Sequence, residues 1–168
     1  MPQVPFESLP DDARLWAFAA ASPLPAAGRA ALLAEVDRFL AQWTAHGAPV
    51  VAGREWRHER FLLIGVDERS TGLSGCSIDA LVRSLRALET RIGAPMVDGP
   101  PVWYRAPSGI EAVTRDAFER LAARGSVGPE TIVFDNTLAS VGELRAGRFE
   151  LPAREAWHGQ AFFQGSGT

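Results

Sequence analysis

The chain has 168 residues, of which 46% are hydrophobic, and its formal net charge is -3. This length supports one domain with a substantial core, and the acidic balance disfavours nucleic acid as a partner because no chain-wide positive field faces a phosphate backbone. All 17 basic residues are arginine, which excludes mechanisms that need a lysine amine, including Schiff-base chemistry and the phosphate-binding lysine of a P-loop.

The single cysteine cannot form an internal disulfide. The N-terminal residues lack the basic and apolar regions of a secretion signal, and no apolar run approaches the ~20 residues that span a bilayer. The sequence therefore predicts a cytoplasmic protein without a membrane span.

The first predicted element is a short buried strand over 13–20, which prolines at 23 and 25 stop. Apolar residues then recur at helical spacing and predict a helix over 26–45. They are Leu32, Leu33, Val36, Phe39, Leu40 and Trp43. Gly47 is expected to end this helix, with His46 in its last turn.

Two strands are predicted over 50–56 and 61–66, joined as a hairpin by the polar residues 57–60. A helix over 77–92 follows, with Ser77 as its N-cap and Gly93 at its end. After two prolines, residues 102–105 predict a further strand. This order of elements predicts the α+β class and a ferredoxin-like βαββαβ sandwich over 12–106.

Residues 107–168 are expected to form a small appendage packed on this core. It would hold a helix over 114–124 with Thr114 as N-cap, a strand over 131–134, and an irregular tail.

The predicted topology brings three distant segments to one rim of the sheet, because the first helix ends where the third strand ends and the second helix begins. These segments are 43–47, 67–68 and 74–77. They supply Cys76 as a candidate nucleophile, His46 as its base and Asp67 as the group that orients the imidazole. The unpaired amides at the helix N-terminus would favour the thiolate.

The same rim is a candidate binding site for a small anion. Helix amides with Ser74, Gly75 and Ser77 would hold the anion, Arg69 would add a positive charge and Trp43 a flat surface. Purely structural roles compete with these interpretations, because cysteine and tryptophan are typical core residues and a histidine at a helix end often contacts the last carbonyls.

The sequence predicts neither a metal nor a cofactor. Three dispersed histidines and one cysteine have no zinc-site spacing, and neither a P-loop motif nor a G-x-G-x-x-G loop occurs.

Several blocks together resemble an uncharacterised bacterial family of similar length whose members are often labelled ABC transporter ATPase. The blocks are 42–47, 60–68, 74–79, 133–137 and 156–158. The resemblance implies no agreed chemistry, and the missing Walker A loop argues against the label. Residues 118–121, 125–127 and 131–133 also resemble part of small GYF-like interaction modules, which implies that the C-terminal part binds a partner.

Two functions follow from the sequence. The first is a binding or regulatory protein for a small anionic ligand or a protein partner. The alternative is a thiol-dependent enzyme with Cys76, His46 and Asp67. The oligomeric state is left open.

Overall fold

The computed structural model describes residues 3–69, 72–97 and 100–164. The chain divides into two compact units. The first unit contains residues Met1–Gly99 and Ala139–Gly142, and the second contains Pro100–Leu138 and Glu143–Thr168. Each unit combines helices with an antiparallel sheet, so the predicted α+β class is confirmed.

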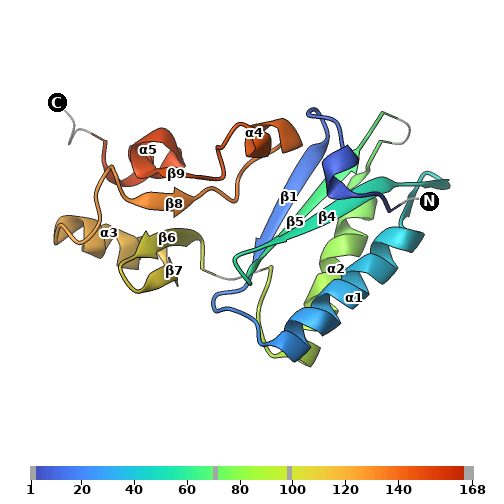
Figure 1. The fold of residues 1–168 in the computed structure, drawn as a ribbon, viewed down its shortest axis with the longest axis horizontal. Coiled ribbons are helices and arrows are strands. Elements are labelled where there is room, and N and C mark those ends of the chain that lie inside the picture. The colour runs from blue at the N-terminus through green and yellow to red at the C-terminus, as the bar shows by residue number, and fades with distance from the viewer. Residues whose placement is uncertain (1–2, 70–71, 98–99, 165–168) are drawn as a thin grey trace. The chain divides into compact units, whose positions relative to one another are not determined.

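The first unit is built on a three-stranded sheet with strand order β1-β5-β4, and a short β2-β3 hairpin accompanies it. Two long helices, α1 and α2, cover one face of this sheet (Figure 1). The elements are η1 (Phe6–Ser8), β1 (Arg14–Ala19), α1 (Ala26–Gln42), β2 (Thr44–Ala45), β3 (Ala48–Pro49), β4 (Val51–Arg57), β5 (Phe61–Asp67) and α2 (Gly75–Ile92).

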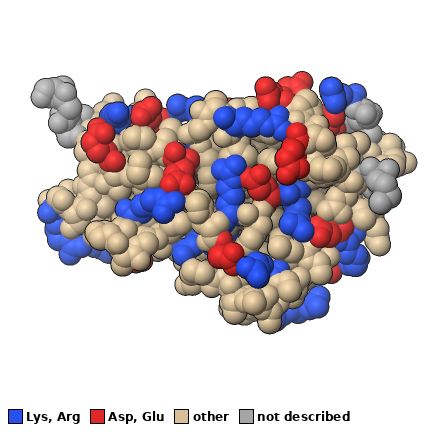
Figure 2. Space-filling view, viewed as in Figure 1, with Lys and Arg blue, Asp and Glu red and all other residues tan. Residues whose placement is uncertain are grey.

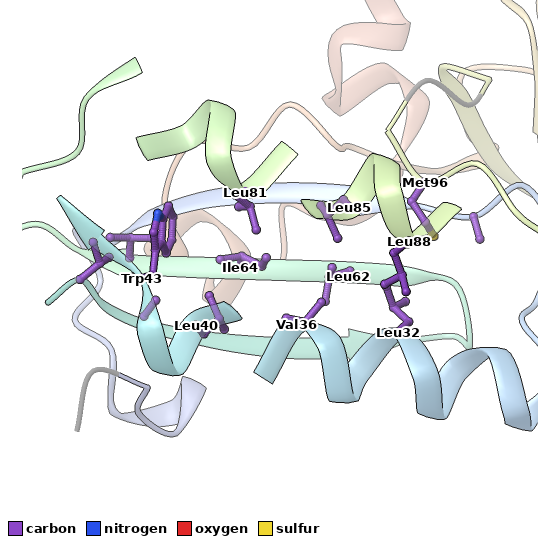
Figure 3. Packing of buried hydrophobic residues seen from close by; sticks show 14 of the residues in the cluster. Leu32, Val36, Leu40, Trp43, Leu62, Ile64, Leu81, Leu85, Leu88 and Met96 are labelled. Atoms are coloured by element: carbon purple, nitrogen blue, oxygen red, sulfur yellow. The ribbon is translucent and has the colours of Figure 1, made fainter. Parts of the chain in front are cut away.

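The core of the first unit lies between the two helices and the central strand β5 (Figure 3). Alternate residues of β5 point to this side, since side chains in a strand alternate between faces. The helices contribute residues at three- and four-residue spacing, as an amphipathic helix requires. The labelled members are Leu32, Val36, Leu40, Trp43, Leu62, Ile64, Leu81, Leu85, Leu88 and Met96.

The other face of the sheet is covered in part by the N-terminal segment. Gly65 of β5 lies there, and a Cβ at this position would be 2.6 Å from Leu9 Cδ1, 3.1 Å from Val141 Cγ2 and 3.2 Å from Phe6 Cε2. The absence of a side chain at Gly65 therefore lets these residues approach the strand closely. Because both faces are covered, every residue of β5 is buried.

Helix α1 ends at Gln42, three residues before the predicted end. His46 and Gly47 have φ angles of 54° and 77° and join β2 to β3. Positive φ at both central residues is typical of a tight hairpin turn, and histidine tolerates this conformation better than most residues. The prediction of His46 in the last turn of the helix is therefore wrong, because turn formation competes with helix propagation at this sequence.

The second unit has a four-stranded sheet with strand order β7-β6-β8-β9. Its elements are β6 (Val102–Ala106), β7 (Gly109–Val113), α3 (Arg115–Ala123), β8 (Ile132–Phe134), α4 (Val141–Arg145), β9 (Glu150–Pro152), η2 (Ala153–Glu155) and α5 (Trp157–Phe162), although the start of α4 belongs to the first unit. The capped helix expected over 114–124 is present, and the Thr114 hydroxyl accepts from the Ala117 amide.

The predicted four-stranded ferredoxin-like sheet is not formed, because strand β6 belongs to the other sheet. The strand predicted over 102–105 as the fourth strand of that sheet is β6, which pairs instead with β7 and β8 in the second unit. The first sheet therefore has three strands, and the predicted boundary after 106 does not follow the sheets. A two-residue turn at 107–108 joins β6 to β7, and closing so short a loop costs less entropy than pairing with a distant strand. The tail expected to be irregular contains α4, β9, η2 and α5.

The outer edge of β1 is met by two irregular segments rather than by a strand. The Ala19 amide donates to the Met96 carbonyl at 3.2 Å, and the Leu15 amide donates to the Ala139 carbonyl at 3.0 Å. Such cover limits the exposure of an open edge. Within the described residues, no helix has the length and apolar character needed to cross a membrane.

Candidate functional site

The first turn of α2 is ordered by Ser74. Its hydroxyl accepts from the Ser77 amide at 3.2 Å, and the two hydroxyl oxygens lie 3.0 Å apart. Ser74 is therefore the N-cap, and the helix starts two residues before the predicted start at Ser77. Ser77 is buried in the first turn, where its amide is already bonded.

The residue that follows α1 contacts the first turn of α2. The indole nitrogen of Trp43 donates to the carbonyl oxygen of Ser77 at 3.1 Å, and the Trp43 ring lies 5.3 Å from the Phe39 ring, centroid to centroid. Trp43 is nevertheless buried in the core. Its ring stabilises the junction of the two helices and offers little surface to a ligand.

Asp67 is bound by its neighbour Arg69. One carboxylate oxygen accepts from the Arg69 backbone amide and Nε, both at 3.0 Å, and the other accepts from the terminal nitrogen at 2.7 Å. The Arg69 guanidinium holds the pKa of Asp67 below its ordinary value, as a hydrogen-bonded opposite charge does. Arg69 is thus engaged by Asp67 and brings less positive charge to the rim than the sequence suggests.

Cys76, His46 and Asp67 do not form a connected group. Cys76 is exposed in the first turn of α2, and His46 is exposed in the β2-β3 turn. Asp67 follows Val66, whose side chain points to the helices, so strand alternation turns the carboxylate to the opposite face. Among the described residues, no hydrogen bond or ion pair joins any two of these three side chains.

An open depression of about 320 Å³ lies beside the first turn of α2. The residues that line it are Arg14, Trp16, Leu73, Ser74, Gly75, Ile78 and Asp79. Arg14 and Trp16 come from β1, which is antiparallel to β5 and so begins at the rim where β5 ends. The predicted topology also places the start of the first strand at this rim, but the sequence pattern of a short buried strand does not mark Arg14 and Trp16 as site residues.

The charge in this depression is held in place by local contacts. The guanidinium carbon of Arg14 lies 4.6 Å from the centroid of the Trp16 ring, a cation-π arrangement. Arg14 is also 3.7 Å from the Glu68 carboxylate and remains about half exposed. Arginine and acidic side chains are interspersed on the face of the molecule drawn in Figure 2.

The backbone amides of Gly75 and Cys76 are open to a ligand. In the described part of the chain, neither amide donates to a protein acceptor, because the helix ladder starts with the Ser77 and Ile78 amides. Orphan amides of this kind and the helix dipole favour a negative charge. Asp79 also lines the depression and adds a carboxylate.

A metal site is not evident in the residues that the structure describes, where no three His, Cys, Asp or Glu side chains are grouped to hold an ion. Comparison of the chain with family models, with curated proteins and with solved structures found no match.

Proposed function

We propose that this protein is a cytoplasmic binding or regulatory protein whose first unit holds a small anionic ligand in the depression between β1 and the first turn of α2. The observation that carries the proposal is that Gly75, whose backbone amide is open, and Arg14, whose guanidinium is half exposed, line the same depression. A carboxylate or phosphate group fits this combination of donors and charge.

Asp79 narrows the class of ligand. Its carboxylate would repel a bare dianion but would accept a hydrogen bond from an amine or hydroxyl. The favoured ligand therefore carries a donor next to its anionic group. The apolar side chains of Trp16, Leu73 and Ile78 would contact its carbon skeleton.

The first prediction tests this site by charge substitution. Calorimetric titration of the full chain with a panel of amino acids, hydroxy acids and phosphorylated hydroxy compounds is expected to find a ligand that Arg14→Gln weakens by about tenfold or more, since hydrogen bonds to charged groups contribute about 1.5–3 kcal/mol. Arg83→Gln is the matched control, because Arg83 is an exposed arginine of α2 outside the depression, and it is expected to leave the affinity unchanged.

Gly75→Asp gives a second arm of the same test. A Cβ at Gly75 meets nothing within 4 Å, and a carboxylate in the first turn is favourable for the helix by about 0.3–1 kcal/mol. The variant is expected to stay folded and to lose the ligand, whereas Gly75→Ala retains it. Equal binding by both Gly75 variants would place the ligand elsewhere, and binding of a protein partner without any small molecule would replace the proposal.

Catalysis at Cys76 is the second candidate, supported by the exposure of its thiol at the start of α2. In this alternative, Cys76 attacks an electrophile with His46 as base and Asp67 as the orienting group. The engagement of Asp67 by Arg69 and the lack of contact among the three side chains favour the binding function instead.

A further inference from the structure

His158 of the second unit is a fully buried imidazole without a polar partner. It is the second residue of α5 and has 0% of its surface exposed. Neither ring nitrogen has a hydrogen-bond partner among the described residues. Its ring stacks on Trp157 with centroids 3.9 Å apart and meets the Phe118 ring edge-on at 6.2 Å. Aromatic packing rather than hydrogen bonding therefore holds His158 in place.

Two charged groups act on this imidazole, one from each of two neighbouring segments. Arg115 at the start of α3 disfavours a second positive charge, and Asp135 after β8 favours it. The charged residues of η2, Arg154 and Glu155, are engaged at the surface with each other and with Glu130. Burial is the largest effect and lowers the pKa of His158 to about 4, so the ring is neutral near pH 7.

Helix α5 depends on this packing for its position. It has six residues and no side-chain hydrogen bond at its N-cap, and helices so short are not stable alone in water. The Phe162 ring lies 4.8 Å from the Phe118 ring, which joins the end of α5 to α3. A charge placed on His158 would lie among these rings with no hydrogen-bond acceptor in contact, which is costly.

We propose that His158 is an acid-sensitive latch, in which protonation of the buried imidazole releases α5 from the second unit. The released state exposes the Phe118 and Phe162 rings, which the latched state packs together. The latch is independent of the anion site proposed for the first unit, because its residues all belong to the second unit.

The direction of the pH effect follows from the thermodynamic linkage between proton binding by His158 and the release of α5. The released imidazole has its ordinary pKa near 6.5, whereas the latched one has a pKa of about 4. The latched state is therefore fully favoured above pH 6.5 and loses stability as the pH falls from 6.5 towards 4. Between pH 7.5 and pH 5.0 the equilibrium constant for release is expected to rise roughly 30-fold.

Hydrogen exchange of the full chain, read by mass spectrometry on peptides covering 157–163, tests the latch. After correction for intrinsic exchange rates, the protection of this segment is expected to fall roughly 30-fold from pH 7.5 to pH 5.0, following the change in release. His158→Phe retains an aromatic ring that cannot be protonated and is expected to abolish this pH dependence. The same fall in His158→Phe, or no fall in the natural chain, would overturn the proposal.

Two further variants keep the test decisive if His158→Phe does not fold. Arg115→Gln removes the charge that opposes protonation, so the latched imidazole accepts a proton more readily. The loss of exchange protection between pH 7.5 and pH 4.0 is therefore expected to be smaller than in the natural chain. Asp135→Asn removes the charge that favours protonation, so the loss of exchange protection over the same pH range is expected to be larger. Each effect is the ratio of protection at pH 7.5 to that at pH 4.0 within one variant. Changes of the same sign in both would contradict the latch.

Discussion

At the scale of single residues, no hydrogen bond or ion pair among the described residues joins the three side chains that the sequence associated. Asp67 is hydrogen-bonded to Arg69, His46 occupies a tight turn and Cys76 stands exposed on α2. The sequence could indicate that their segments meet at one rim, and the bond from Trp43 to Ser77 is consistent with that. It could not indicate side-chain direction, which depends on strand alternation and on the local turn.

The thiol provides a direct prediction at this scale. Iodoacetamide is expected to alkylate Cys76 in the native chain without prior unfolding, because the residue is exposed. His46→Ala is expected to leave the pH profile of the rate unchanged, since no contact between His46 and Cys76 is present among the described residues. Mass spectrometry of the singly labelled protein measures the rate. A displaced profile in His46→Ala would support the thiol-dependent enzyme.

At the scale of elements, α2 was predicted well in its body and wrongly at its start. Its apolar stripe repeats along the whole helix and is a strong signal of helical structure. The N-cap, in contrast, depends on one hydrogen bond, and both Ser74 and Ser77 fit the sequence pattern of an N-cap. The paired strands β4 and β5 were also predicted, because β5 has a long apolar run and a polar turn separates it from β4.

The N-cap gives a prediction at the element scale. Ser74→Ala is expected to lower the free energy of unfolding by about 1 kcal/mol, because the Ser77 amide loses its side-chain acceptor. Ser74→Asp retains an acceptor and is expected to restore most of this loss. Urea unfolding followed by circular dichroism measures both variants. If Ser77 were the functional cap, Ser74→Ala would leave the stability unchanged.

At the scale of the whole molecule, the chain returns to its first unit after leaving it. Residues 139–142 belong to the first unit, where the Val141 amide donates to the Ala13 carbonyl at 2.9 Å and the Gly142 amide donates to the Asp11 carbonyl at 2.7 Å. A Cβ at Gly142 would lie 2.9 Å from the Asp11 carbonyl oxygen. This position therefore tolerates no side chain without a backbone shift.

Gly142→Val is accordingly expected to destabilise the first unit by about 1–3 kcal/mol, the usual cost of overpacking. Hydrogen exchange should show the loss in peptides covering 11–19, more than 120 positions away in sequence. Gly128→Val is the control, because a Cβ there meets nothing within 4 Å. Equal protection of 11–19 in both variants would contradict the assignment of 139–142 to the first unit.

The sequence by itself determined the α+β class, the two long helices, the β4-β5 hairpin and the capped helix α3, since local periodicity and turn residues encode such elements. Only the tertiary structure decided that β6 pairs with β7 rather than beside β1, that Arg14 and Trp16 lie next to the start of α2, and that His158 is buried without a polar partner. These features depend on which distant segments pack together, and that choice is made by competing burial and loop-closure energies over the whole chain.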